Sequence, residues 1–269
     1  MVFHAIGGIM QCDLILDDGF FRPLSTYVDG LPFHLLQQNF TYGVFSSRQD
    51  EASDAAGYEI YPYKDLSQER AALHRQLATW LADADVSMVV LWANLGVARQ
   101  EILLYEILVW LAETRWGDKV SARCVDLAEL PQPAFQEGTA AYYQRIYRDF
   151  SLPQNNNPLT PELTAGARNT LSSLYHTGHL IVRHKDVLAA LPTNFFDEVI
   201  VSVASKHYQP VKVLTAKVML SLWAKGYAEV EDVVIMSRIL FLASHDHRLQ
   251  VRKNIFDQNL ISNVYIKLK

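Results

Sequence analysis

The residues with the clearest chemical potential follow a predicted buried strand at 86–92. Trp92 and Asn94 lie at the end of that strand, and Gln100 and Glu101 open the helix that is predicted next. In open α/β sheets, ligands bind beyond the carboxyl ends of the strands. We therefore expect these four residues to line a ligand-binding site. The alternative is structural, with Asn94 as a helix cap and Glu101 as a first-turn acid favoured by the helix dipole.

A second candidate is the glycine pair that follows a predicted first strand at 2–7. Backbone amides of Gly7 and Gly8 could approach an anionic ligand, as in phosphate-binding turns. The dinucleotide fingerprint also needs a third glycine and an acidic residue about 20 positions later. Asp29 meets the second condition, but the third glycine is missing. The pattern predicts a site for a small molecule or nucleotide at Gly7, Gly8 and Asp29, with an ordinary tight turn as the alternative.

Histidines and cysteines offer weaker patterns. The histidines group as His176, His179 and His184, and as His245 and His247. Gly178 is expected to break the helix between the first pair, and Asp186 is the only nearby carboxylate that could complete the first group, so we predict no metal site. The two cysteines, Cys12 and Cys124, stand alone, which excludes a disulfide framework and a cysteine zinc site. No motif identifies a cofactor.

No recognisable catalytic motif occurs in the chain. It lacks a nucleophile elbow, a phosphate-binding P-loop, a zinc-protease helix motif and an EF-hand loop. Catalytic residues therefore stay unknown. One enzymatic alternative remains open, in which a crevice formed by Asp29, Asn94 and Glu101 processes a small molecule with Glu101 or Asp29 as general base.

The end of the chain predicts a partner-binding surface. A helix at 230–244 precedes two alternating segments, 248–252 and 263–268, that read as a hairpin. Three helices followed by a hairpin is the order of a winged-helix domain. The helix carries one base-reading residue, Arg238, so we do not expect DNA binding. The hairpin cations Arg248, Arg252 and Lys253 are predicted to contact a partner protein, by strand addition at the hairpin edge.

The elements that position these residues have helical or strand periodicity. A continuous apolar run at 86–92, an amphipathic helix at 98–114 and a strand at 120–127 form a βαβ unit, which predicts a parallel or mixed sheet. The other expected elements are strands at 2–7, 13–17 and 25–29, and helices at 65–83, 161–177, 185–191, 194–207, 211–225 and 230–244. The predicted fold class is an α/β domain with flanking helices, followed by a mainly helical, winged-helix-like domain.

Composition and charge divide the chain in the same way. Half of the 269 residues are apolar, as in globular proteins. Residues 1–150 carry a formal charge of −9 and are predicted to be the α/β domain, 151–161 a linker rich in Pro and Asn, and 162–269, where the balance is positive, the helical domain. An acidic chain is unlike a whole-chain nucleic-acid binder. No secretory signal or apolar run of about 18 residues is visible, so we expect a cytoplasmic protein with no membrane partner.

Short motifs over most of the chain resemble those of a bacterial family. In the first half they are Phe3-His-Ala-Ile-Gly7, Asp29-Gly-Leu-Pro-Phe33, Val89-Val-Leu-Trp92, Gln100-Glu101 and Leu104. These resemble the domain of unknown function number eighteen thirty-five. In the second half, Phe196-Asp197, Arg238, Leu242, His247 and Val264-Tyr-Ile-Lys-Leu268 resemble its usual companion, domain of unknown function number thirty-six fifty-eight. The resemblance implies a two-domain plan and no established activity.

The chain departs from the family pattern at two places. The family tends to have a polar turn of the type Gly-Asp-Ser where this chain has Gly7-Gly8-Ile9-Met10, and Asp-Asp-Leu-Ser where this chain has Asp29-Gly30-Leu31-Pro32. Ligand contacts through those polar groups are therefore not carried over. We expect a cytoplasmic ligand-binding or accessory protein whose first domain binds a small molecule or nucleotide and whose second domain contacts a partner protein.

Overall fold

A computed structural model of the chain divides it into two compact units. The first consists of Met1–Phe40 and Ser67–Ser173, and the second of Thr41–Leu66 and Leu174–Lys269. The residues that the structure describes are 4–6, 9–28, 33–41, 65–82, 86–116, 120–134, 136–151, 157–158, 160–177, 180–192, 194–228, 230–253 and 264–269.

The first unit is built on a mixed sheet whose central strands are parallel. β2 (Ile9–Ile15) pairs in parallel with β3 (Phe33–Leu35) and β4 (Val86–Ala93), and β4 pairs in parallel with β5 (Ser121–Asp126). The short strands β1 (His4–Ile6) and β6 (Asn157–Pro158) add antiparallel pairs at β2 and β5. The parallel strands therefore run in the order β3-β2-β4-β5, as in doubly wound sheets.

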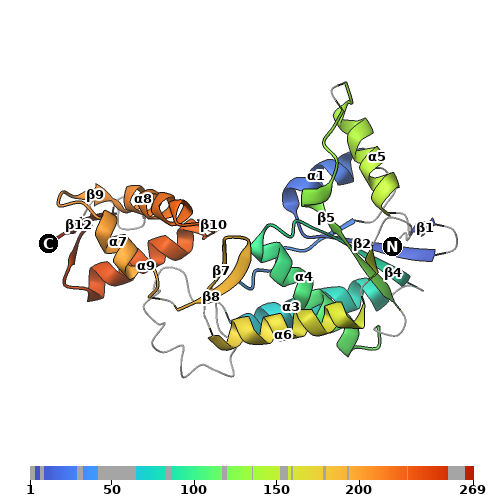
Figure 1. Cartoon of the computed structure of the whole chain (residues 1–269), viewed down its shortest axis with the longest axis horizontal. Coiled ribbons are helices and arrows are strands. Elements are labelled where there is room, and N and C mark those ends of the chain that lie inside the picture. The colour runs from blue at the N-terminus through green and yellow to red at the C-terminus, as the bar shows by residue number, and fades with distance from the viewer. Residues whose placement is uncertain are drawn as a thin grey trace. The chain divides into compact units, whose positions relative to one another are not determined.

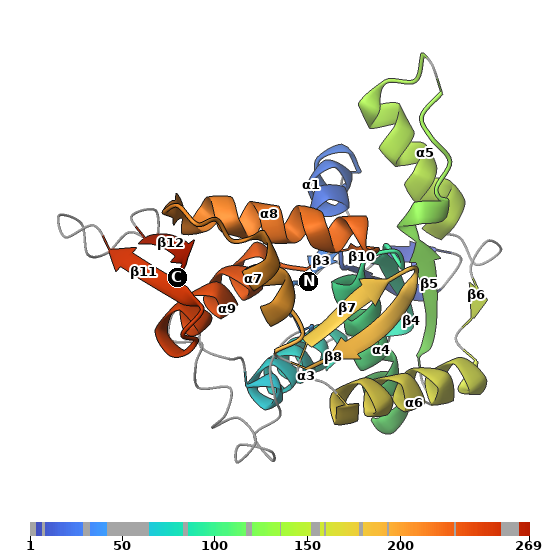
Figure 2. The same ribbon diagram turned by 60° about the vertical axis from the view of Figure 1, so that its left-hand side comes forward.

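Helices cover both faces of this sheet. α1 (Asp18–Tyr27) and α5 (Thr139–Ser151) lie on one side of β2, β4 and β5, and α3 (Leu66–Ala82), α4 (Ala98–Glu113) and α6 (Pro161–Thr177) lie on the other (Figures 1 and 2). Because both faces are covered, β4 is apolar along almost its whole length and buried at every position except Ser87. The predicted α/β class is confirmed, and so is the βαβ unit of β4, α4 and β5.

An aromatic cluster beneath α1 and α5 encloses a buried carboxylate. Asp13 is only 4% exposed, and it accepts hydrogen bonds from the indole Nε1 of Trp92 at 2.9 Å and from the hydroxyl of Tyr147 at 3.0 Å. The side-chain amide of Gln11 donates to both of its carboxylate oxygens. Trp92 also stacks on Phe20. A buried carboxylate is tolerated only when its oxygens are bonded, and these donors meet that requirement.

The second unit combines two small antiparallel sheets with helices. One sheet has the order β10-β7-β8, from β7 (Leu180–His184), β8 (Val187–Leu191) and β10 (Tyr227–Ala228). The other has the order β11-β12-β9, from β9 (Gln209–Pro210), β11 (Leu249–Lys253) and β12 (Val264–Leu268). The helices are α7 (Asp197–Val203), α8 (Val211–Ala224) and α9 (Asp232–His245). Their inner faces form one core with β12, as the burial of Leu214, Ile239 and Ile266 indicates.

Two predicted elements are wrong. The strand expected at 25–29 overlaps α1, because the Asp17 carboxylate caps that helix through the Phe20 amide at 2.8 Å, and burial of Leu24 stabilises it despite the internal Pro23. The helix expected at 185–191 is instead a turn followed by β8.

The turn between β7 and β8 explains the second error. Lys185 and Asp186 have φ angles of 48° and 66°, so both central residues of the two-residue turn are left-handed, as in a type I′ hairpin. The expected glycine or asparagine is absent, and the sequence therefore hides the turn. The helix expected at 194–207 is present in a shorter form, as α7.

The unit boundary differs from the predicted linker at 151–161. Within that segment, β6 pairs with β5. Beyond it, the guanidinium of Arg168 on α6 lies 3.1 Å from the Glu113 carboxylate on α4. The first unit accordingly extends to Ser173. None of the helices that the structure describes is long and apolar enough to cross a membrane.

Candidate functional site

The ends of β2 and β4 are joined by a side chain that the sequence singles out. Gln100, in the first turn of α4, is 4% exposed. Its amide nitrogen donates to Asp17 Oδ2 at 2.6 Å, and its amide oxygen accepts from the backbone nitrogen of Asn94 at 2.7 Å. Both ends of the amide are thus used in linking the loops that follow the two strands. This geometry gives Gln100 a positioning role at the carboxyl edge of the sheet.

The other predicted site residues of the first unit lie in different environments. Asn94 accepts a hydrogen bond from the Gly96 amide at 2.9 Å and so stabilises its own loop. Glu101 accepts one from the Tyr105 hydroxyl, one turn further along α4. Trp92 is fully buried, because its indole lies in the core beside Asp13. The expectation that Trp92 lines an accessible site is therefore not met, while Gly7, Gly8 and Asp29 lie outside the described residues.

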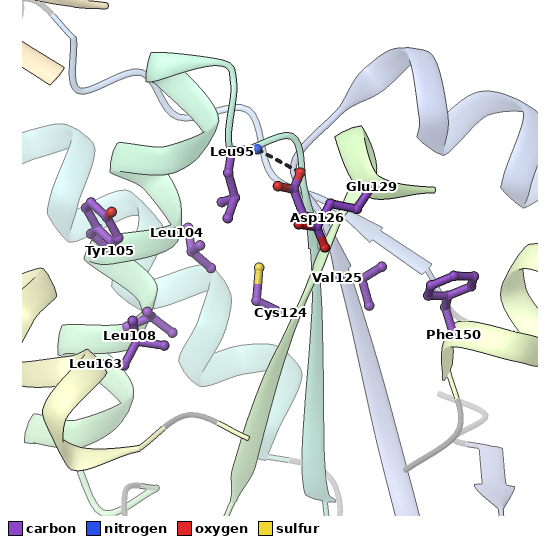
Figure 3. Close-up of a pocket in the computed structure, with 10 residues that line it drawn as sticks. All are labelled: Leu95, Leu104, Tyr105, Leu108, Cys124, Val125, Asp126, Glu129, Phe150 and Leu163. Carbon is purple, nitrogen blue, oxygen red and sulfur yellow. Dashed lines mark hydrogen bonds between the residues drawn. The ribbon is translucent and has the colours of Figure 1, made fainter. Parts of the chain in front are cut away.

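A cavity of about 260 Å³ lies next to this edge, at the end of β5 (Figure 3). Its walls come from the loop after β4, from α4, β5 and the short 3₁₀ helix at Leu127–Glu129, and from α5 and α6. The lining residues are Leu95, Leu104, Tyr105, Leu108, Cys124, Val125, Asp126, Glu129, Phe150 and Leu163. The walls are mainly apolar, and the polar groups are few, as in small-molecule sites.

The cavity carries acidic groups and no basic ones. Asp126 Oδ1 accepts hydrogen bonds from the backbone nitrogens of Leu95 at 3.2 Å and Ala128 at 2.9 Å, which fixes the carboxylate at the end of β5. Glu129 is exposed, and Figure 3 shows it beside Asp126. None of the ten lining residues is Arg, Lys or His. The arrangement therefore favours a cation or a hydrogen-bond donor over an anion.

Cys124 lies at the centre of the lining, between Leu104 and Val125 in Figure 3. Burial, together with the negative charges of Asp126 and Glu129, raises the pKa of its thiol to about 12. The thiol is therefore neutral near pH 7, whereas a cysteine nucleophile must be a thiolate. Cys124 contributes a weak donor and a polarizable wall to the cavity.

His184 and His245 pack against neighbouring aromatic rings. His245 Nδ1 lies 2.9 Å from the Phe241 carbonyl oxygen, and the two rings stack. His184 stacks on Tyr227. His179 lies outside the described residues. In the part of the chain that the structure describes, no group of three His, Cys, Asp or Glu side chains is placed to hold a metal ion.

The hairpin cations differ from one another in their surroundings. Arg248 forms ion pairs with Asp246 at 2.8 Å and Glu198 at 3.0 Å, and its hydrogen bonds lower the pKa of Asp246 to about 2. Arg252 is exposed, and its guanidinium lies 6.0 Å from the centroid of the Tyr208 ring. The backbone of Lys253 ends β11. The guanidinium of Arg248 is thus paired with carboxylates of its own unit, whereas the exposed side chain of Arg252 is accessible to a partner.

The predicted site residues after β4 lie at the edge of the sheet next to the cavity, but none of them lines it. Asp126 lies near the carboxyl end of the strand predicted at 120–127, and this position could have suggested it, since polar groups at the ends of parallel strands are often functional. No sequence pattern near Asp126 indicates that Phe150 and Leu163 line the same cavity, because these residues belong to helices later in the chain. Comparison of the chain with protein-family models, with curated proteins and with solved structures finds no match, and the family resemblance of its motifs therefore stays a prediction.

Proposed function

We propose that this chain is an accessory protein whose first unit binds a small molecule and whose second unit contacts a partner protein. The observation that supports ligand binding is the cavity at the end of β5, which combines leucine walls with the carboxylates of Asp126 and Glu129. Its position beyond the carboxyl end of a parallel strand is the usual place for a ligand in such sheets.

The lining supports a ligand with an apolar body and an amine or hydroxyl group. Two unit charges about 4 Å apart near a protein surface interact by about 4 kcal/mol, so a phosphate beside Asp126 would be repelled by a similar amount. A nucleotide, which the glycine pair at Gly7 and Gly8 suggests, is therefore the less favoured ligand of this cavity. An amine beside the same carboxylate would be attracted by an interaction energy of similar size.

An enzyme with a carboxylate general base is the alternative, and it receives less support. The Glu101 carboxylate accepts a hydrogen bond from the Tyr105 hydroxyl, and Asp29 lies outside the described residues. The neutral Cys124 thiol is unsuited to covalent catalysis. The cavity thus offers binding groups rather than an activated nucleophile.

The element order of the second unit supports a winged-helix-like domain that contacts protein. From α7 the chain continues through β9, α8, β10 and α9 to the hairpin of β11 and β12, and β9 completes the final sheet. α9 occupies the position that reads DNA in such domains. Its only arginine, Arg238, is 8% exposed and makes two hydrogen bonds of 2.6 Å with the Asp197 carboxylate. A protein partner is therefore favoured over DNA.

Ligand binding can be tested with three probes that differ in charge. Phenethylamine and phenylpropionate share a phenyl ring and a short chain, and adenosine monophosphate is the third probe. Isothermal titration of the full chain should detect the amine with higher affinity than either anion. Asp126→Asn, which keeps an acceptor oxygen for the Leu95 and Ala128 amides, and Glu129→Gln should each weaken amine binding several-fold.

The matched control is Glu113→Gln, which removes one negative charge from α4 outside the cavity. This change should leave amine binding as it is. Equal affinities for amine and carboxylate, or equal effects of all three substitutions, would contradict a ligand site at Asp126 and Glu129. Turnover of a bound probe would instead support the enzymatic alternative.

A further inference from the structure

Helix α8 of the second unit has apolar residues on both of its faces. On the inner face, Val211, Leu214, Val218 and Leu222 are completely buried in the core of the unit. On the outer face, Val213 is 44%, Leu220 61% and Trp223 52% exposed. A helix that is apolar all round is normally covered on all sides, so the exposed face of α8 is unusual for a surface helix.

The exposed side chains form a single stripe. Positions 213, 220 and 223 are separated by seven and three residues, a spacing that places them on one side of a helix. Ala216 and Ala224 are exposed on the same side. Among the residues that the structure describes, five large apolar side chains are exposed, and three of them belong to this one helix. Clustered exposure of this kind marks interaction surfaces, and tryptophan is enriched among the residues that dominate binding energy.

The border of the stripe is basic. Lys212, Lys217 and Lys225 are exposed along α8 and at its end. Lys217 donates to the side-chain oxygen of Gln209 at 2.7 Å, which is a neutral partner, and α8 itself contains no Asp or Glu. In the described part of the chain, no ion pair involves these three lysines. The face therefore offers an apolar strip bordered by positive charge.

We propose that this face of α8, with Val213, Leu220 and Trp223 at its centre, binds an amphipathic helix of a partner protein whose apolar stripe is bordered by Asp or Glu. The inference rests on the proposed role of the second unit in contacting a partner. Apolar stripes of two helices pack against each other in this mode, and the charged borders select the partner.

Charge argues against a second copy of the same helix as the occupant. If two α8 helices packed through this face, the lysine borders of both copies would face one another, and like charges in close contact oppose association. An acidic border on the partner would instead pair with Lys212 and Lys225. The chemistry of the border therefore selects an acidic helix over self-association.

The test uses two synthetic peptides of about 18 residues, which is five helical turns. Both have the same leucine and alanine stripe, and their borders carry either glutamate or lysine. Each is labelled with fluorescein and titrated with the full chain, and binding is followed by fluorescence anisotropy. We expect the glutamate peptide to bind at least tenfold more tightly than the lysine peptide, and acrylamide quenching of Trp223 to fall in the complex, with Trp223→Phe identifying its signal.

Substitutions on the stripe have a matched control in the same unit. Leu220→Glu should weaken binding of the glutamate peptide at least tenfold, and the milder Leu220→Ala should weaken it in the same direction. Val187, which is 65% exposed in the β7–β8 hairpin, provides the control Val187→Glu, with the same chemical change at a different exposed position. Circular dichroism melts of all three variants separate lost binding from lost folding.

Several results would overturn the inference. Equal affinity for both peptides, or equal effects of Leu220→Glu and Val187→Glu, would refute the acidic-helix partner. A dimer that Leu220→Glu dissociates in sedimentation equilibrium would assign the face to self-association. Peptide binding that survives Leu220→Glu and is lost in Arg252→Glu would move the partner to the hairpin, which refutes this surface but keeps the proposed function. Amine binding by the first unit is measured separately and is unaffected by these outcomes.

Discussion

The hydroxyl group of Tyr147 should make a measurable contribution to the stability of the first unit. It donates to Asp13 Oδ2 at 3.0 Å, and both side chains are buried, at 7% and 4% exposure. Tyr147→Phe removes this donor and keeps the ring, which packs edge-on against Phe33 and stacks near Trp92. The substitution therefore isolates the hydrogen bond from the packing of the aromatic cluster.

The expected magnitude follows from the charge and burial of the acceptor. Hydrogen bonds to charged groups contribute about 1.5–3 kcal/mol, and an acceptor in the core cannot recover the bond from water. Asp13 keeps its bonds from Gln11 and Trp92, which limits the loss, whereas Ser151 loses the hydroxyl to which it is hydrogen bonded. We expect the free energy of unfolding of the first unit to fall by about 2 kcal/mol.

Urea unfolding followed by tryptophan fluorescence can measure this change. In a Trp223→Phe background, all remaining tryptophans belong to the first unit, so the signal reports that unit alone; they are Trp80, Trp92, Trp110 and Trp116. The matched control is Tyr143→Phe. Tyr143 contacts the Phe20 ring, and no hydrogen bond of its hydroxyl occurs within the described residues.

The control should change the free energy of unfolding by less than about 0.5 kcal/mol, as is usual away from buried hydrogen bonds. A loss below about 0.5 kcal/mol in Tyr147→Phe, or a loss equal to that of Tyr143→Phe, would refute the energetic role given to the Asp13 cluster. A changed dependence on urea would mean that the substitution alters the unfolding transition itself.

Three further outcomes are expected. Burial and the charge of Asp13 raise the pKa of Tyr147 above its usual value, so the unfolded chain loses the Tyr147 proton at a lower pH than the folded chain does. The free energy of unfolding, measured in urea, should therefore fall as the pH rises above about 10, and it should fall less steeply in Tyr147→Phe. Arg238→Leu leaves Asp197 without its guanidinium and should cost about 3 kcal/mol by calorimetry, with Asp197→Leu in the same chain recovering most of it. Gln100→Leu should lower the free energy of unfolding by about 2 kcal/mol and leave amine affinity within twofold, since Gln100 does not line the cavity; a larger change in affinity would contradict its positioning role.

The elements that could be predicted from the sequence are those with a strong periodic signal. The continuous apolar run at 86–92 predicts a buried strand, and the wide apolar stripe at 98–114 predicts a helix. Both predictions are confirmed, by β4 and α4. α1 could not be predicted, because Asp18 and Gly19 resemble a turn and Pro23 resembles a stop, whereas burial of Phe20 and Leu24 outweighs these local preferences. Tertiary packing decides such segments.

The candidate site shows the same division. The polar residues after β4 could be placed at the edge of the sheet from the sequence, because strand ends meet there. The role of each residue could not, since it depends on partners far along the chain. Gln100 uses both ends of its amide on Asp17 and Asn94, and the cavity exists only where α5 and α6 bring Phe150 and Leu163 to β5.

The bond between Asp13 and Tyr147 also bears on how the chain folds during synthesis. The two residues are 134 positions apart, so the ribosome releases most of the first unit before the last donor of the buried carboxylate emerges. Until then β2 carries a carboxylate that the forming core cannot fully satisfy, which favours solvent-exposed, incomplete states of the nascent sheet. The set of donors around Asp13 is therefore complete only after α5 has been synthesised.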